Sequence, residues 1–187
     1  NFISNIDGFA ATLEKEPNFT PFGDLLTVFT MDDKQQLKDG GDANVKRVFE
    51  IYKSESNDKA FQNYHENMQT FLLWFIDAAS YIDIEDDRWD FFLLYEKVVS
   101  NGIPNGQSGT SVIGYHFVGY MTVYRYYAYP ENTRPRISQV LVLPPFQKKG
   151  LGVRLLEAVY SYYKTKKSVI DVTVEDPSDN FTRLRDF

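Results

Sequence analysis

The sequence predicts an α+β fold in which helices flank a mixed, largely antiparallel sheet. Its first 127 residues hold four β-rich segments, in two pairs that are each joined by a polar connection, and this favours antiparallel pairing. Residues 140–143, Val-Leu-Val-Leu, form a continuous apolar run that is typical of a strand buried on both faces. A helical pattern and another β-rich run, residues 168–175, follow it. The last strand should therefore lie parallel to residues 140–143 through a right-handed crossover.

The first part of the chain is expected to form a short helix and a hairpin. Ser4 or Asn5 can cap a helix that runs through Leu13. Residues 25–30 alternate and are rich in strand-forming types, and residues 45–53 return as their partner across a loose polar connection, residues 32–44. The chain is thus predicted to be one domain, residues 1–187, in which residues 1–56 precede a cofactor- and substrate-binding core, residues 57–187.

A long helix is expected over residues 57–76, capped by Asn57 or Asp58. Its last turns, residues 71–76, are apolar all round, so this end is predicted to be buried. Asp77 follows at that end, where an acid opposes the helix dipole and needs a reason, such as a hydrogen bond to a neighbour.

Two further strands precede the apolar run. Residues 89–99 and 112–127 are β-rich, and residues 101–109 have the composition of a mobile loop. Gly114 and Gly119 are expected to mark bends or bulges in the second of these strands. A proline-flanked turn, from position 130 to position 135, then leads into the apolar strand.

The stretch after the apolar strand has the composition of an anion-binding loop. Pro144 and Pro145 end the strand, because neither can donate a ladder hydrogen bond. In residues 147–152, Gln-Lys-Lys-Gly-Leu-Gly, two glycines let backbone N–H groups approach a phosphate at a helix N-terminus, and two lysines add positive charge. A dinucleotide-binding loop needs a third glycine where Leu155 stands, and a Walker loop needs a Gly-Lys-Ser/Thr that the stretch lacks.

At this loop the sequence resembles the GCN5-related N-acetyltransferase superfamily, whose Gln/Arg-x-x-Gly-x-Gly/Ala signature is matched by Gln147, Gly150 and Gly152. Further segments resemble the type B histone acetyltransferase family in order and spacing, and the resemblance runs from Phe9 to Phe187. These segments are Trp74-Phe-Ile-Asp-Ala-Ala79, Asp87-Arg-Trp89, Gly119-Tyr-Met-Thr-Val-Tyr124, Arg134-Pro-Arg-Ile-Ser-Gln139 and Val174-Glu-Asp-Pro177.

The resemblance implies an acyl-CoA N-acyltransferase fold with an acetyl-CoA site. It implies that the apolar strand pairs with the pantetheine arm, that the loop holds the pyrophosphate, and that Ser178 lies near the cofactor. Leu151 stands where relatives often carry histidine, a change that binding through backbone N–H groups should survive. The implied cofactor-binding residues are Val140, Leu141, Val142, Gln147, Lys148, Lys149, Gly150, Leu151, Gly152, Val153 and Ser178.

Carboxylates are the candidate bases. A lysine ε-amine has an ordinary pKa of about 10.4, so it must lose a proton before it attacks a thioester. The chain has no Cys for an acyl-enzyme, and His65 and His116 lack zinc-ligand spacing, so both are read as structural or surface residues. The resemblance makes Glu175 the general base, with Asp176 and Asp77 nearby. Asp176 can equally cap the last helix, and Asp77 is shorter than the Glu that the family carries there.

Four residues match positions that line the histone-tail groove of the family: Trp89, Tyr124, Arg125 and Tyr126. Aromatic walls can flank a lysine stem, and the acidic residues 85–87 can attract a basic tail. Core packing is the alternative for Tyr124 and Tyr126, because alternate residues of a strand face inward whatever the function.

Composition narrows the class of protein further. The 187 residues, 43% apolar and 16% aromatic, can support a packed core. The absence of Cys fits a reducing compartment. The sequence has no run of 18 apolar residues, so no membrane span is expected. A net charge of −6 disfavours direct nucleic-acid binding and is compatible with a basic protein substrate. The missing initial Met and a helical pattern cut off at Phe187 suggest truncation at both ends.

The predicted function is a histone acetyltransferase that transfers acetyl from acetyl-CoA to a lysine ε-amine of a free histone tail. Transfer is expected to be direct, in a ternary complex and without a metal. The resemblance further implies histone four as substrate, a WD-repeat histone chaperone as partner, and a location in nucleus and cytoplasm. Two alternatives remain: an acetyltransferase of this superfamily for another amine, and a histone-binding module with little catalysis.

Overall fold

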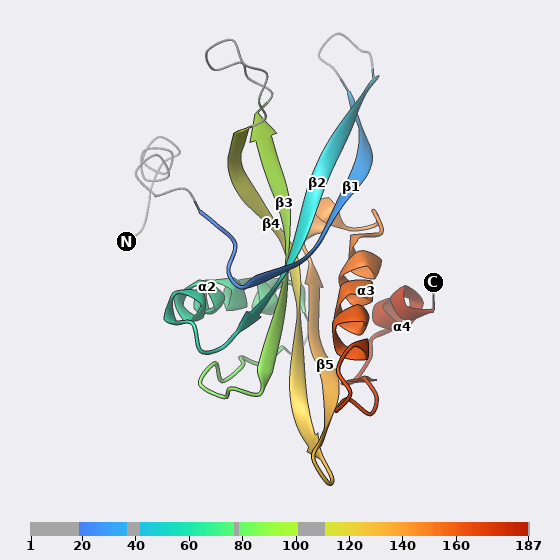
Figure 1. Cartoon of the computed structure of the whole chain (residues 1–187). Coiled ribbons are helices and arrows are strands. Elements are labelled where there is room, and N and C mark those ends of the chain that lie inside the picture. Colours follow the sequence, from blue (N-terminus) through green and yellow to red (C-terminus); the bar gives the residue numbers. More distant parts are fainter. Residues whose placement is uncertain (1–18, 37–41, 77–78, 101–110, 187) are drawn as a thin grey trace.

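The computed structural model of the chain describes residues 19–36, 42–76, 79–100 and 111–186. These residues form a six-stranded sheet in the order β1-β2-β3-β4-β5-β6. Helix α2 covers one face of the sheet, and α3 and α4 cover the other (Figure 1). The strands β1 to β5 are antiparallel neighbours, and β6 is parallel to β5. The predicted mixed, largely antiparallel sheet flanked by helices is therefore confirmed.

The elements follow one another in the predicted order. The strands are β1 Asp24–Gln36, β2 Asp42–Glu55, β3 Trp89–Ser100, β4 Ser111–Ala128, β5 Asn132–Val142 and β6 Thr173–Val174; the helices are α2 Lys59–Phe75, α3 Leu151–Lys164 and α4 Asp179–Arg185, and a short 3-10 turn spans Pro144–Phe146. The predicted helix capped by Ser4 or Asn5 and the predicted mobile loop 101–109 lie outside the described residues. No helix among the described ranges is both long and apolar enough to cross a membrane.

Two expected connections are shorter than predicted, because cross-strand pairing extends the strands into polar sequence. Strand β1 continues to Gln36 and β2 begins at Asp42, where a loose connection over residues 32–44 was expected. Polar side chains support this extension, since Arg47 of β2 bonds Asp33 of β1 at 2.8 Å. Likewise β5 begins at Asn132, inside the expected turn.

The last strand differs most from its prediction. Instead of residues 168–175, only Thr173 and Val174 form β6, with one isolated bridge at Val169. These two residues pair with Arg136 and Ile137 at the middle of β5. The strand is therefore parallel to β5, as predicted, but it is shorter than expected and pairs before residues 140–143 rather than alongside them. The pattern of alternation signalled an extended segment, but it could not specify which part of β5 the segment would meet.

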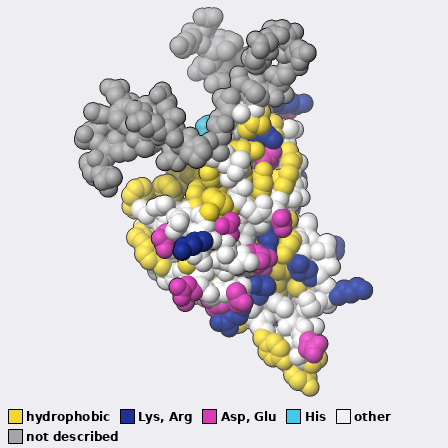
Figure 2. All heavy atoms as spheres, turned by 60° about the vertical axis from the view of Figure 1, so that its left-hand side comes forward, with side chains coloured by type: hydrophobic (Ala, Val, Ile, Leu, Met, Phe, Trp, Pro, Cys, Tyr) yellow, Lys and Arg dark blue, Asp and Glu magenta, His cyan; other side chains and the backbone are white. Residues whose placement is uncertain are grey.

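Helix α2 begins as predicted and ends differently. The Asp58 side chain accepts hydrogen bonds from the backbone N–H groups of Ala60 and Phe61, so of the two predicted N-caps, Asn57 and Asp58, it is Asp58 that caps the helix. The far end is not buried, since Trp74 is 69% exposed. A helix that lies on a sheet buries one stripe, and positions 73 to 75 point away from the stripe that contains Leu72. Figure 2 shows the side of the molecule on which α2 lies, with hydrophobic side chains at its surface.

The glycines of β4 mark irregular pairing, as predicted. The register between β3 and β4 shifts at Gly119 and again at Gly114. Gly119 also allows a close approach, because a Cβ built there would lie 2.3 Å from the carbonyl oxygen of Leu141 in β5. This contact brings β4 directly against the part of β5 that leads to the glycine-containing loop.

Candidate active site

The C-terminal half of β5 presents an open edge. On one side, Val140, Leu141 and Val142 pair with β4. On the other side, pairing with the β6 segment ends where the N–H of Glu175 donates to the carbonyl of Ile137 at 2.8 Å. Within the described ranges no strand pairs with residues 140–142 on that side. Their backbone groups are therefore available to an extended ligand that adds as a strand.

The loop that follows β5 is built for an anion. Lys148 and Gly150 both adopt positive φ, at 60° and 76°, and Gly150 is the N-cap of α3 without any side-chain cap. Left-handed residues within a turn can let backbone N–H groups face an anion, and the uncapped first turn of α3 adds further free donors. A left-handed conformation costs a non-glycine residue about 1 kcal/mol, and such strain is concentrated at functional sites.

A cavity of about 530 Å³ lies where this loop meets α3 and α4. Val142, Gln147, Lys148, Gly150, Leu151, Gly152 and Val153 line it, so the structure brings together seven of the predicted cofactor-binding residues. Ser178 stands apart from its walls and caps α4, its Oγ accepting the N–H of Phe181 at 3.2 Å. Lys149 turns away, toward Asp33 on β1.

Sequence reasoning missed the wall that α4 contributes to this cavity. Asn180, Arg183 and Leu184 complete the lining. A Cβ on Gly152 would lie 2.7 Å from Leu184 Cδ1, so the glycine lets α4 come close to the first turn of α3. The only sequence signal for this wall was the helix start at Asp-Pro-Ser, which places a basic residue one turn further on.

The carboxylates follow β6. Glu175 is exposed and its Oε2 accepts a hydrogen bond from Ser138 Oγ of β5 at 2.7 Å. Asp176 has a φ of 36°, a left-handed conformation that aspartate tolerates better than most residues. Because Ser178 is the helix cap, Asp176 is left without that structural role. Asp77 lies outside the described residues.

An aromatic row lies on the α2 face of β3 and β4. The ring centroids of Trp89 and Tyr124 lie 4.8 Å apart in an edge-to-face arrangement, and those of Tyr124 and Tyr126 lie 4.7 Å apart. The Arg136 guanidinium lies 4.7 Å from the centre of the Tyr126 ring. Tyr126 is 40% exposed, whereas Trp89 is half-buried and packs against the core cluster on the α2 face.

The acidic segment between α2 and β3 closes one side of this row. Tyr124 donates its hydroxyl proton to Asp86 Oδ2 at 3.0 Å. The guanidinium of Arg88 holds the pKa of Asp86 well below its usual range, and the Tyr124 hydroxyl lowers it further. Burial raises the pKa of Tyr124, and the hydrogen bond to Asp86 adds to that rise. Asp86 is therefore an anion beside a neutral phenol at physiological pH.

Arg125 does not share this face. Strand alternation turns it toward α3, where its Nε lies 3.4 Å from Asp90 Oδ2 and it bonds the carbonyl of Asp87. There it lines a polar cavity of about 190 Å³ together with Lys53 and Tyr163. The structure thus groups three of the four predicted substrate-binding residues and separates Arg125 from them.

The buried side-chain amide of Gln139 connects β5 to the segment between α2 and β3, and sequence reasoning missed this residue. Gln139 Oε1 accepts the hydroxyl of Tyr120 at 3.1 Å, and its Nε2 donates to the carbonyl of Ser80 at 2.8 Å. Gln69 of α2 accepts the N–H of Ile82 at 2.9 Å. The two glutamines hold residues 79–82 between α2 and β5, and so position the chain that carries Asp86.

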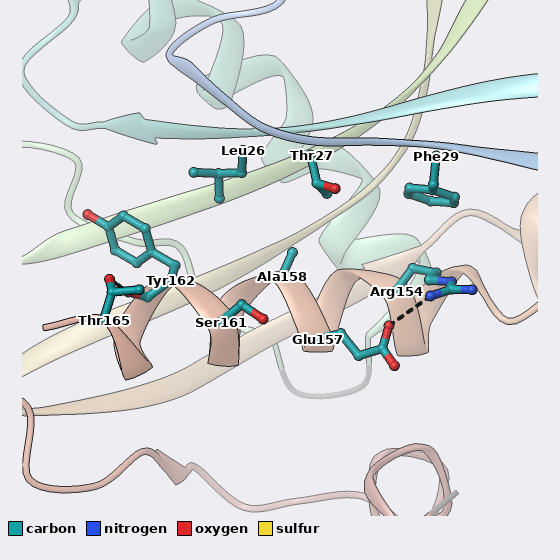
Figure 3. Close-up of a pocket in the computed structure, with 9 residues that line it drawn as sticks. All are labelled: Leu26, Thr27, Phe29, Arg154, Glu157, Ala158, Ser161, Tyr162 and Thr165. Atoms are coloured by element: carbon teal, nitrogen blue, oxygen red, sulfur yellow. Dashed lines mark hydrogen bonds and ion pairs between the residues drawn. The ribbon is translucent and has the colours of Figure 1, made fainter.

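Another hollow, of about 470 Å³, lies between β1 and α3 (Figure 3). Leu26, Thr27 and Phe29 point into it from β1, and α3 faces them with the ion pair of Arg154 and Glu157, 3.2 Å apart. None of the predicted site residues lines it. Among the residues that the structure describes, no three His, Asp or Glu side chains gather as metal ligands would.

Comparison with known proteins agrees with this geometry. Residues 45–184 match the acetyltransferase (GNAT) family, and residues 1–77 match the histone acetyl transferase HAT1 N-terminus family. Histone acetyltransferase type B catalytic subunits from Rattus norvegicus and Homo sapiens are each 45% identical over 186 residues, which is 100% of this chain and 41% of theirs. An aminoglycoside acetyltransferase of known structure, from an uncultured soil metagenomic sample, aligns with a TM-score of 0.47 at 18% identity over 73% of this chain and 83% of its own.

The chain spans about two fifths of the length of the curated relatives that it matches. Within that span, the family match covers the open edge of β5, the loop with its cavity, and Glu175. The chain therefore belongs to the acetyltransferase (GNAT) family, and its similarity to histone acetyltransferase type B catalytic subunits extends over its whole length.

Proposed function

We propose that the chain is the catalytic core of a histone acetyltransferase, which moves acetyl from acetyl-CoA to a lysine ε-amine of a free histone tail. The observation that carries the proposal is the open edge of β5, which runs into the anion-binding loop at one end and has Glu175 at the other, where pairing with the β6 segment stops. The family match supports acetyl transfer, and the similarity of the whole of this chain to part of the type B catalytic subunits supports a histone as acceptor.

The donor site follows from the shape of acetyl-CoA. Its extended pantetheine arm carries amides that can bond the free backbone groups of residues 140–142. Its pyrophosphate then meets the N–H groups of the loop and the first turn of α3. Lys148 and Arg183, which both line the cavity, supply positive charge for the phosphates. This chain thereby holds the thioester in place before the acceptor arrives.

The acceptor reacts in a ternary complex. Glu175, the proposed base, takes a proton from the lysine ammonium, with Asp176 and Asp77 as its neighbours. The neutral amine then attacks the thioester carbonyl, and the N–C bond forms as the C–S bond breaks. The second proton of the attacking nitrogen goes to the departing sulfur, so that CoA leaves as the thiol. The Ser138 hydroxyl orients the Glu175 carboxylate through the 2.7 Å bond. The row of Trp89, Tyr124 and Tyr126 flanks the lysine stem, and the acidic segment attracts the basic tail.

Similarity of this chain to part of the type B catalytic subunits is also the support for the finer parts of the proposal. These are histone four as the substrate, a WD-repeat histone chaperone as the partner, and action in nucleus and cytoplasm.

A peptide panel tests the proposed substrate class. The protein is incubated with labelled acetyl-CoA and the histone four tail, other histone tails, a scrambled basic peptide or a polyamine, and products are identified by mass spectrometry. Preference for one lysine of the histone four tail is expected. Preference for the polyamine would move the acceptor to a small amine, and tail binding without any transfer would make the chain a histone-binding module.

Glu175→Gln tests the proposed base. Because a positioned general base contributes about 10²- to 10⁴-fold, kcat should fall by that order while KM for the tail peptide changes little. Glu157→Gln is the matched control, since Glu157 is an exposed glutamate of α3 that pairs with Arg154. A kcat for Glu175→Gln equal to that of the control would remove Glu175 from the mechanism.

A further inference from the structure

We propose that Asp33 and Arg47, two side chains of the β1–β2 hairpin, position the phosphate-binding loop for its cofactor. The phosphate-binding loop here means residues 147–150. The inference rests on the proposed acetyl-CoA site and adds two positioning residues from outside its walls.

The loop has few contacts of its own. All four of its residues are exposed. Two side-chain hydrogen bonds hold it from opposite sides. Gln147 Nε2 donates to the carbonyl of Val142 in β5 at 2.7 Å, and Lys149 Nζ donates to Asp33 Oδ2 in β1 at 2.9 Å. The second bond spans 116 positions of the sequence and is the loop's side-chain tie to the hairpin.

Asp33 is itself held firmly by Arg47. The Arg47 Nη1 donates to Asp33 Oδ2 at 2.8 Å, while its other nitrogens bond both carboxylate oxygens of Glu96 in β3. The same guanidinium lies 5.4 Å from the centre of the Phe146 ring, directly before the loop. Arg47 therefore contacts the residue before the loop and, through Asp33, the lysine within it.

The charges of this network are stable at neutral pH. Hydrogen bonds from Lys149 and then Arg47 lower the pKa of Asp33 below its ordinary value. Burial alone would raise the pKa of Glu96, but the hydrogen bonds from Arg47 and His116 lower it. A cavity of about 220 Å³ remains between the hairpin and the loop, lined in part by Asp33, Arg47 and Lys149. Ionic contacts therefore connect the hairpin to the loop at a place where the two are not closely packed.

A fixed loop matters for binding more than for folding. Lys148 and Gly150 hold left-handed conformations, and a turn of this kind can present its backbone N–H groups to an anion. Without the tie through Lys149 the loop would sample other conformations, and the cofactor would have to order it on binding. Exposed ion pairs contribute little to global stability, so the effect should be visible in cofactor affinity and hardly in thermal unfolding.

Asp33→Asn tests this role, with the neighbouring Asp32→Asn as the matched control for the loss of one negative charge. The dissociation constant of acetyl-CoA is measured by calorimetry on the purified protein, and KM and kcat are measured with the best acceptor peptide. For Asp33→Asn we expect the dissociation constant and KM to rise roughly threefold to tenfold with kcat unchanged, the size of effect that a held ion pair can produce. Asp32→Asn should bind as the wild type does.

A double-mutant cycle with Lys149→Met shows whether the effect runs through the lysine. Asp33→Asn should weaken binding when Lys149 is present and have no effect when it is replaced. Equal or tighter binding by Asp33→Asn in the wild-type background would overturn the inference, because Asp33 would then merely compete with phosphate for Lys149. Wild-type protein that fails to bind acetyl-CoA at all would overturn the proposed function itself, and the inference with it.

Discussion

His65 shows how far burial can change a single side chain. This α2 residue is fully buried, and the centroid of its ring lies 4.7 Å from that of Phe91 and 5.8 Å from that of Phe61. Neither ring nitrogen has a hydrogen-bond partner within the described structure. Burial lowers its pKa to about 4. The sequence predicted a structural or surface residue at this position, and the structure places His65 fully inside the core.

The His65 pKa predicts loss of stability in mild acid. Its folded pKa lies below the ordinary 6.5, so between these values the unfolded chain binds a proton that the native chain does not. Stability therefore rises with pH through this window and falls on acidification, by about 2 kcal/mol between pH 7 and pH 5. Urea unfolding at both values should show a drop about that much larger for the wild type than for His65→Leu. Equal drops would mean that the ring is protonated in the native state.

At the level of secondary-structure elements, β4 connects β3, which carries Trp89 of the aromatic row, to β5, which carries the open edge. Its N-terminal part pairs irregularly with β3, and its central part supports β5 residues 140–142 from one side so that their other edge stays open. Gly114 and Gly119 were both expected to mark irregularities, and both do. They differ in what surrounds them, which no sequence pattern could show.

This difference predicts opposite results for two alanine substitutions in one strand. A Cβ at Gly119 would lie 2.3 Å from the carbonyl oxygen of Leu141, and backbone cannot move aside cheaply. Gly119→Ala should lose about 2 kcal/mol or more of unfolding free energy and weaken acetyl-CoA binding, since it pushes on β5. A Cβ at Gly114 meets nothing within 4 Å, so Gly114→Ala should be within about 1 kcal/mol of the wild type. Denaturant unfolding of both variants decides the matter, and equal losses would contradict the close approach.

At the scale of the whole molecule, Asp90 joins four elements beneath the α3 face. Its side chain is 2% exposed, and its carboxylate lies 3.0 Å from Lys53 Nζ of β2 and 3.4 Å from Arg125 Nε of β4. The Tyr163 hydroxyl of α3 donates to it at 2.6 Å. Burial and then the charge of Asp90 raise the pKa of Tyr163, so this hydroxyl stays protonated and remains a donor.

Removal of the Asp90 charge should lower the free energy of unfolding of the protein. Asp90→Asn leaves Lys53 and Arg125 without their common buried anion, and breaking such a pair typically costs about 3–5 kcal/mol. We expect a loss of at least about 3 kcal/mol, measured by urea unfolding at pH 7. Glu157→Gln, which breaks an exposed pair, should cost no more than about 0.5 kcal/mol. Similar small losses in both variants would show that Asp90 is not a structural centre.

The position of Arg125 illustrates the limit of sequence reasoning about the site. It stands between Tyr124 and Tyr126, and resemblance grouped all three. Strand alternation carries it to the opposite face, where Asp90 binds it. Lys149 likewise belongs to the predicted loop, but its side chain leaves the cavity for Asp33, a partner 116 residues away.

The order of strands and helices, a helix cap at Asn57 or Asp58, the irregularities of β4 and the glycine-containing loop before α3 all follow from the sequence alone. These features depend on periodicity and on backbone preferences of Pro, Gly and Asp, which act over a few neighbouring residues. Only the tertiary structure decided where β6 meets β5, which end of α2 is exposed, which residues of α4 line the cavity, and how Gln139 and Asp33 hold the chain around the site. Each of these depends on contacts between residues far apart in the chain, and the energy of such contacts is set by the packed fold as a whole.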